Sequence, residues 1–150
     1  MIKRQPIISL LAEDDPAHAE IVRRKLKDFS VANRFFWVKD GQAALDFLFR
    51  KGAYADPETT PRPDLILLDL RLPKVDGLGV LRRIKNEEDI KRIPTIVLTT
   101  SGDISDIAAA YIHGAGSYLV KPLNFEKFDK LLESLCSYWL TWNRFPGHDG

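Results

Sequence analysis

The chain has 150 residues, with 22 lysines and arginines against 21 acids, so its formal net charge is only +1. This balance gives no electrostatic reason to expect nucleic acid or an anionic membrane as a partner. A length of this order suits one domain with one core, expected to span 1–150 with its core at about 7–135. Cys136 is the single cysteine, which excludes an internal disulfide and predicts a reducing compartment, the cytoplasm. No apolar run is long enough to span a membrane.

The first half of the chain alternates short apolar runs with amphipathic segments. The predicted elements are a strand at 7–12, a helix at about 16–28, a strand at 34–38 and a helix around 44–49 that closes at Gly52. The segment 53–63 has three prolines and is predicted to hold no regular element. Leu65 to Leu68 are four consecutive aliphatic residues, which indicates a strand buried on both faces.

The second half continues the same alternation. The predicted elements are a helix from Leu78 to about Asn86, a strand at 95–98, a short helix at 104–113, a strand at 118–120 and a last helix capped by Asn124. Five strand-helix units of this kind predict an α/β fold with a doubly wound five-stranded parallel sheet. The flavodoxin-like (βα)5 arrangement, with strand order 2-1-3-4-5, is the expected architecture.

Polar side chains follow four of these strands at their carboxyl ends. They are Glu13 and Asp14, then Asp69, Thr99 and Lys121. If the first and third strands are neighbours, the three carboxylates converge at the switch point of the sheet. Two such charges 4 Å apart repel by about 4 kcal/mol at an effective dielectric of 20, so the cluster calls for a cation or a raised pKa. Mg²⁺, a hard cation with oxygen ligands, is the predicted cofactor.

A carboxylate, a magnesium ion, an ammonium group and a hydroxyl are the groups that phosphoryl transfer requires. Asp69 is the candidate nucleophile, and Lys121 and Thr99 are placed to hold the phosphoryl oxygens. The expected product is an acyl phosphate on Asp69.

Four segments of the chain resemble the signatures of receiver domains of two-component response regulators. They are 10–16 (LLAEDDP), 67–77 (LLDLRLPKVDG), 98–101 (LTTS) and 118–122 (YLVKP), in the order that the family has them. The resemblance covers about 7–135. It implies a phosphoacceptor protein, not an enzyme in the usual sense, whose chemistry is limited to its own phosphorylation and dephosphorylation.

The resemblance also implies individual roles. Asp69 would be the phosphoacceptor, Asp14 a direct magnesium ligand, Glu13 an outer ligand acting through water, and the carbonyl of Arg71 a third protein ligand beside Asp14 and Asp69. Glu13 stands where many family members have Asp, which adds one methylene and should preserve metal binding.

Three further residues take roles from the same resemblance. Lys121 would pair with the phosphate, and its bond to Pro122 would be a cis peptide. Thr99 and Tyr118 would form the switch pair, the hydroxyl moving toward the phosphate and the ring turning inward. No DNA-binding output domain is expected, so the output must be a contact with a protein.

The last helix carries more apolar surface than one face of a sheet needs. One stripe contains Phe125, Phe128, Leu132, Leu135 and Trp139, and a second contains Leu131, Tyr138 and Trp142. Aromatic patches commonly mark interfaces, so a homodimer through Leu131, Tyr138, Trp139 and Trp142 is predicted. Alternatively, the two tryptophans pack within the chain against the first helix or the tail.

The long loop before the third strand and the Tyr-Trp-Leu run resemble those of single-domain regulators paired with cyanobacterial phytochromes. That resemblance implies a sensor histidine kinase as partner, a phytochrome in particular, and a dimer built on the last helix.

Two other functions compete. A phosphatase of the haloacid dehalogenase type also uses a strand-end Asp, but it needs a second Asp where this chain has Arg71. A receiver-like interaction module that is never phosphorylated is the other alternative. His18, His113 and His148 show no ligand spacing and are interpreted as surface or helix-end residues.

Overall fold

The computed structural model describes residues 5–147 and places five parallel strands in one sheet of order β2-β1-β3-β4-β5. The strands are β1 (Ile7–Ala12), β2 (Asn33–Val38), β3 (Leu65–Leu68), β4 (Thr95–Thr99) and β5 (Ser117–Val120). β1 pairs with both β2 and β3, with Ala12 opposite Leu68, so the ends of these two strands lie side by side. The predicted fold class and strand order are therefore confirmed.

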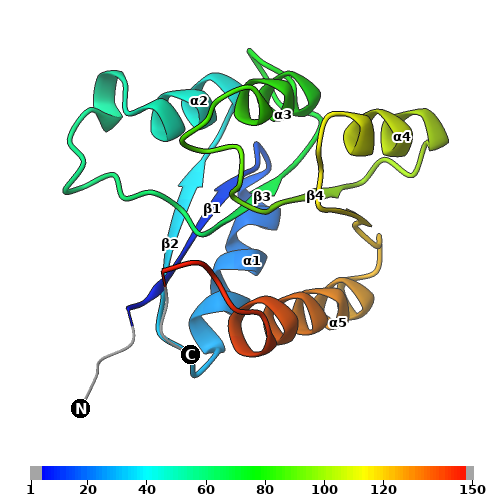
Figure 1. Ribbon diagram of the computed structural model, residues 1–150. Helices are drawn as coiled ribbons and strands as arrows, with labels where there is room; N and C mark the ends of the chain where they lie inside the picture. The colour runs from blue at the N-terminus through cyan, green and yellow to red at the C-terminus, as the bar shows by residue number, and fades with distance from the viewer. Residues whose placement is uncertain (1–4, 148–150) are drawn as a thin grey trace.

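Five α-helices connect the strands and cover both faces of the sheet (Figure 1). They are α1 (Pro16–Asp28), α2 (Gly41–Phe49), α3 (Gly77–Lys85), α4 (Ile104–Ile112) and α5 (Phe125–Cys136). Four of them begin at a residue whose side chain accepts hydrogen bonds from the first turn, namely Asp15, Asp40, Asp76 and Asn124. The polar residues that precede the apolar runs in the sequence thus fix where the helices start.

Alternate side chains of the central strands enter two separate cores. Ile66 and Leu68 of β3 pack with α2, α3 and α4, whereas Leu65 and Leu67 pack with α1 and α5. In Figure 1, α2, α3 and α4 lie above the sheet, and α1 and α5 lie below it. Because all four side chains are buried, β3 needs the continuous aliphatic run that the sequence has.

The structure corrects the sequence analysis at two connections. Gly52–Tyr54 forms one turn of 3-10 helix, in a loop that was expected to begin at residue 53 without any regular element. Tyr54 packs on Phe47 with ring centroids 5.2 Å apart, which anchors this turn to α2. The second correction concerns the Lys121–Pro122 peptide, because no cis bond occurs within residues 5–147. The energy difference between the two isomers before proline is small, about 0.5–1 kcal/mol, so the resemblance alone does not fix it.

The last helix changes its winding after Cys136. Ser137–Trp142 is a π-helix, and the N–H of Asn143 donates to the carbonyl of Tyr138. The wider turn rotates the side chains away from the 3.6-residue stripe on which the sequence analysis relied. As a result Leu140 is buried. Phe145 is also buried and belongs to the core between the sheet and helices α1 and α5, so this core extends past the expected limit of residue 135.

No helix within residues 5–147 is both long enough and apolar enough to cross a membrane.

Candidate functional site

The carboxyl ends of β1 and β3 bring three acidic side chains together. Glu13, Asp14 and Asp69 each offer a carboxylate oxygen within 4.8 Å of the other two. Glu13 and Asp69 are buried and Asp14 is exposed, so one ligand faces solvent. An all-oxygen set of this kind fits a hard divalent cation, which takes carboxylates and completes its shell with water.

Backbone contacts hold the two buried acids in place. The N–H of Asp69 donates to the carbonyl of Ala12 at 3.1 Å, and the N–H of Glu13 donates to the carbonyl of Val38 at 3.0 Å. The Trp37 indole N–H donates to the carbonyl of Glu13 at 2.7 Å. Hydrogen bonds from β3 to β1 and between β1 and β2 therefore fix the backbone that carries the two carboxylates.

Lys121 reaches this cluster from the end of β5. Its backbone N–H donates to the carbonyl of Thr99 at 2.7 Å, and its buried ammonium group donates to Glu13 and, at 3.3 Å, to Asp69 Oδ2. An ammonium beside two carboxylates offsets part of their mutual repulsion. The sequence analysis predicted that these residues would meet, and the fold brings them together.

The electrostatics separate the two buried acids. Burial raises the pKa of Glu13 to about 7, against the lowering effect of Lys121, and the neighbouring Asp69 raises it further. Burial also opposes ionisation of Asp69, but the Lys121 charge and nearby hydrogen bonds outweigh it and lower the pKa of that carboxyl. Asp69 is thus the ionised member of the pair at neutral pH, as a nucleophile must be.

Thr99 is the last residue of β4 and is fully buried. Its hydroxyl makes no well-formed hydrogen bond within residues 5–147, although it helps to lower the pKa of Asp69. A buried hydroxyl without a firm partner is uncommon and is ready to donate to a new acceptor.

Tyr118 lies half-buried in β5, with its hydroxyl donating to the carbonyl of Ser101 at 2.8 Å. The Ser101 hydroxyl in turn donates to Asp106 Oδ2 at 2.6 Å. Arg71 binds the same carboxylate oxygen through Nη2 at 2.7 Å. This network connects the loop after β3, the loop after β4 and the first turn of α4, and sequence reasoning did not foresee it.

Two further residues at the site were missed. Gly77 opens α3, and a Cβ there would lie 2.3 Å from the carbonyl oxygen of Asp69, so only glycine fits. His18, expected to be a surface or helix-end residue, lies with Nδ1 3.1 Å from the Lys121 ammonium. Its position in the first turn of the helix that follows the acids was the signal that could have found it. His113 caps the end of α4 as expected, and His148 lies outside the described residues.

The predicted interface residues divide into two pairs. Tyr138 and Trp142 are exposed to 53% and 74%. Leu131 and Trp139 are half-buried and line a groove with Leu119 of β5. The alternative of packing within the chain holds for Trp139, whose ring lies 5.9 Å from that of Phe145 in the tail.

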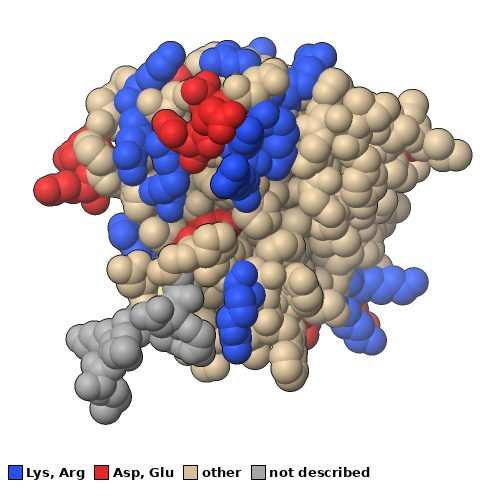
Figure 2. Space-filling model, viewed as in Figure 1, with Lys and Arg blue, Asp and Glu red and all other residues tan. Residues whose placement is uncertain are grey.

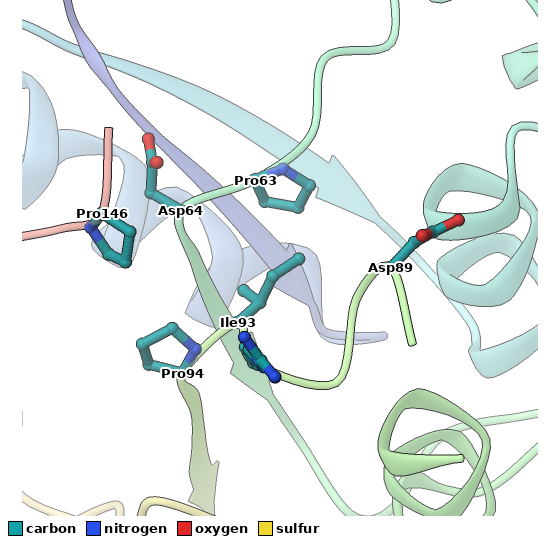
Figure 3. A pocket seen from close by; sticks show the side chains of 7 residues that line it. Pro63, Asp64, Asp89, Ile93, Pro94 and Pro146 are labelled. Carbon is teal, nitrogen blue, oxygen red and sulfur yellow. The ribbon is translucent and has the colours of Figure 1, made fainter. Parts of the chain in front are cut away.

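A second pocket lies at the amino ends of the strands, away from the acidic cluster. Pro63, Pro94 and Pro146 border it from three separate segments, together with Asp64 and Ile93 (Figure 3). None of the acidic or basic residues of the cluster lines it. This pocket is therefore separate from the acidic cluster.

A flavodoxin-like sheet with clustered carboxylates, a lysine and a hydroxyl at its carboxyl edge defines a phosphoacceptor module of the receiver class. The family described as response regulator receiver domain matches residues 9–133. The chain therefore belongs to the receiver domain family, the phosphoacceptors of two-component signalling, and not to a conventional enzyme family.

Individual relatives match almost the whole chain. The probable methanogenesis regulatory protein FilR2 of Methanothrix harundinacea is 46% identical over 95% of this chain and 89% of its own length. The response regulator Rcp1 of Synechocystis is 42% identical over 94% of both chains.

Two solved structures are equally similar in shape. The Mn²⁺-bound form of Rcp1 superposes with a TM-score of 0.90 at 41% identity, over 95% of this chain and all of the other. The phosphorylated cyanobacterial phytochrome response regulator RcpA gives the same TM-score and coverage at 34% identity.

Proposed function

We propose that Asp69 accepts a phosphoryl group from a sensor histidine kinase and that its phosphorylation changes the contacts that the protein makes. The observation that carries this proposal is the convergence of Glu13, Asp14 and Asp69, with the Lys121 ammonium in contact with Glu13 and Asp69. This arrangement supports the roles of a nucleophile, a cation site and a fixed positive charge at the carboxyl edge of the sheet.

In the transfer, an Asp69 carboxylate oxygen forms a bond to phosphorus while the bond from phosphorus to the donor breaks. The donor leaves with the electron pair of that bond. Asp69 is suited to attack because its lowered pKa keeps it ionised. The Lys121 ammonium, already 3.3 Å from Asp69 Oδ2, then pairs with a phosphoryl oxygen.

Glu13, Asp14, Asp69 and the carbonyl of Arg71 are the proposed holders of Mg²⁺. When bound, the cation supplies neutralising charge for the phosphoryl oxygens. The geometry of the three carboxylates supports a divalent cation, and Mg²⁺ is our specific choice because the ligands are all oxygen.

Thr99 and Tyr118 are the proposed switch pair. The Thr99 hydroxyl gains an acceptor when a phosphoryl oxygen arrives, since it now lacks a firm one. Movement of Thr99 shifts the β4–α4 loop, where Tyr118 is bound to Ser101. A phosphoryl group carries about −1.5 to −2 charges, enough to bias such a two-state loop.

The exposed apolar side chains of α4 and of the start of α5 are candidates for the protein contact that phosphorylation changes. Ile104 and Ile112 of α4 are 86% and 79% exposed, and Leu123 and Phe125 lie exposed before and at the start of α5. Figure 2 shows that the side of the molecule carrying α4 has few charged groups in this view. Such a surface suits a protein partner better than nucleic acid.

Two observations bear on the competing functions. Where a haloacid dehalogenase phosphatase needs its second Asp, the Arg71 side chain is paired with Asp106 and offers no acid or base. A module that is never phosphorylated would have no use for an ionised Asp69 beside a buried lysine.

Incubation with acetyl phosphate and Mg²⁺, followed by intact mass measurement, tests the proposal. We expect one added phosphoryl group in the wild-type chain and none in Asp69→Asn, which keeps the size of the side chain but cannot attack. Asp64→Asn, at the opposite edge of the sheet, is the matched control and should be phosphorylated normally. Steady phosphate release from many esters would support the phosphatase. No mass change in any variant would support the interaction module that is never phosphorylated.

For the partner kinase we propose a phytochrome, on the strength of the likeness to RcpA. FilR2 has the higher sequence identity and is named for another process, so a second candidate is a kinase of methanogenesis control. Phosphotransfer from purified kinases of each kind, compared at equal concentration, distinguishes the two. We also propose action in the cytoplasm and self-association through the last helix.

A further inference from the structure

A histidine lies inside the site although no role has been assigned to it. His18 is in the first turn of α1, four residues after Asp14, and its side chain is 32% exposed. Its Nδ1 lies 3.1 Å from the ammonium of Lys121, which is 103 residues away in sequence. Its ring makes a T-shaped contact with Phe128 of α5, with centroids 5.8 Å apart. The ring is therefore fixed between two helices and directed at the lysine.

The contact with Lys121 determines which ring nitrogen carries the proton. A lysine ammonium has three donors and no acceptor, so a nitrogen 3.1 Å away must present a lone pair. Nδ1 is thus the acceptor, and the proton of the neutral ring is on Nε2. Each ring nitrogen also lies 3.6 Å from a carboxylate oxygen, Nδ1 from Glu13 Oε1 and Nε2 from Asp15 Oδ2, so the closer contact with the Lys121 ammonium assigns the tautomer.

Asp15 is itself held in place. Its Oδ1 accepts the N–H of Ala17 at 2.9 Å and that of His18 at 3.4 Å, as the N-cap of α1. The helix cap therefore fixes the Asp15 carboxylate beside the imidazole, and the imidazole lies within hydrogen-bond distance of the ammonium.

The ammonium has three acceptors around it, namely Glu13, His18 and Asp69. Glu13 and Asp69 both belong to the proposed cation site, so cation binding and phosphorylation involve the same carboxylates that Lys121 contacts. His18 is the one acceptor of the three that carries no negative charge and takes no part in the proposed cation site. It can therefore hold Lys121 in one direction throughout the reaction.

We propose that His18 is a positioning residue, which fixes the Lys121 ammonium for phosphoryl transfer by accepting one of its hydrogen bonds at Nδ1. This inference rests on the proposed roles of Asp69 and Lys121. An ammonium group on a flexible four-carbon chain stabilises developing charge best when its direction is already set.

Two nearly isosteric variants isolate this hydrogen bond. His18→Asn places its amide oxygen the same number of bonds from Cα as Nδ1, whereas His18→Leu has the same branching without an acceptor. The maximal rate of phosphorylation by acetyl phosphate at saturating Mg²⁺ should fall about five-fold in His18→Leu, the effect of one ordinary hydrogen bond. His18→Asn should recover most of the rate, and the half-saturating Mg²⁺ concentration should stay within about two-fold in both, because no metal ligand changes.

His18→Gln and His113→Leu complete the design. Gln carries its acceptor at the Nε2 distance and should not restore the rate, which separates a directed contact from general polarity. His113→Leu removes a histidine from the end of α4, away from the acidic cluster, and should leave the rate unchanged. Thermal unfolding checks that each variant is folded. If His18→Leu does not fold, the phosphorylation rates of His18→Asn and His18→Gln still test the proposal.

The proposal is overturned if His18→Leu matches the wild type, if Gln restores the rate as well as Asn, or if the loss appears in the Mg²⁺ requirement. Failure of the parent proposal looks different. In that case the wild-type chain would not be phosphorylated, or Asp69→Asn would still be phosphorylated, whereas failure of the His18 inference leaves the wild type active, Asp69→Asn inactive and His18→Leu normal.

Discussion

At the scale of single residues, the site depends on one buried ion cluster whose members affect each other's protonation. Glu13 is 2% exposed and Asp69 7%, and both face the ammonium of Lys121. Burying carboxylates is costly unless charge and hydrogen bonds compensate. Glu13 therefore reduces the stability of the metal-free protein at neutral pH, because burial disfavours its charged form, whereas the Lys121 charge stabilises ionised Asp69.

The pKa of Glu13 gives a pH-dependent stability in the absence of metal. Because it is raised from 4.5 to about 7 in the folded chain, its stabilising effect is complete below about 4.5 and is lost as the pH rises through 7. The free energy of unfolding in EDTA should fall between pH 5 and 8, relative to Glu13→Gln, by up to about 3 kcal/mol. The lowered pKa of Asp69 affects the free energy of unfolding at pH values below this range.

Urea unfolding of both proteins at several pH values provides the measurement. Parallel curves for wild type and Glu13→Gln would show that Glu13 is not protonated in the folded chain. Added Mg²⁺ should stabilise the wild type more at pH 8 than at pH 5, because the cation binds the ionised carboxylates.

At the scale of secondary-structure elements, Asp106 connects three segments that a receiver must move together. Its Oδ2 accepts from both Arg71 and Ser101, so the loops after β3 and β4 are tied to α4. Arg71 is 63% exposed, so this ion pair contributes little to global stability. Its role is to order the loop.

Asp106→Asn should therefore loosen the β4–α4 loop without unfolding the protein. We expect faster amide hydrogen exchange in residues 101–107 and a change in unfolding free energy below about 1 kcal/mol. Glu20→Gln removes a comparable pairing with Arg23 and Arg24 within α1 and is the control, since it connects no separate elements. Unchanged exchange in the loop after Asp106→Asn would contradict this interpretation.

In the last helix and its π-helical extension, the exposed side chains differ from those that the helical period of the sequence predicts. Phe125 belongs to the predicted buried stripe but is 62% exposed, because it lies in the first turn of α5. After Cys136 the π-helix turns Trp142 outward and Leu140 inward. The exposed aromatic surface is thus smaller than the sequence suggested, and it is concentrated at Tyr138 and Trp142.

At the scale of the whole molecule, the proposed homodimer and the apolar side near α4 concern different faces. Tyr138 and Trp142 extend from the end of the last helix, next to the groove of Leu119, Leu131 and Trp139. Ile104 and Leu123 lie nearer the β4–α4 loop and the start of α5. One surface can serve self-association while the other responds to phosphorylation.

Sedimentation tests which face the dimer uses. Trp142→Glu should convert a dimer to a monomer, because it places a charge in an apolar contact that aromatic side chains dominate. Leu123→Glu alters a side chain that is fully exposed on the other face and should leave the dimer intact. The reverse result would place the interface near α4, and a monomeric wild type would exclude the dimer.

The sequence by itself determined the layers and the positions of Asp69, Asp14 and Lys121. Their apolar runs and strand ends are local features, and parallel strands necessarily bring their carboxyl ends to one edge. The tertiary structure alone decided the place of His18, the pairing of Arg71 with Asp106 and the outward turn of Trp142. These depend on side-chain directions and on contacts between segments far apart in the chain, for which the helical or strand period of one segment carries no information.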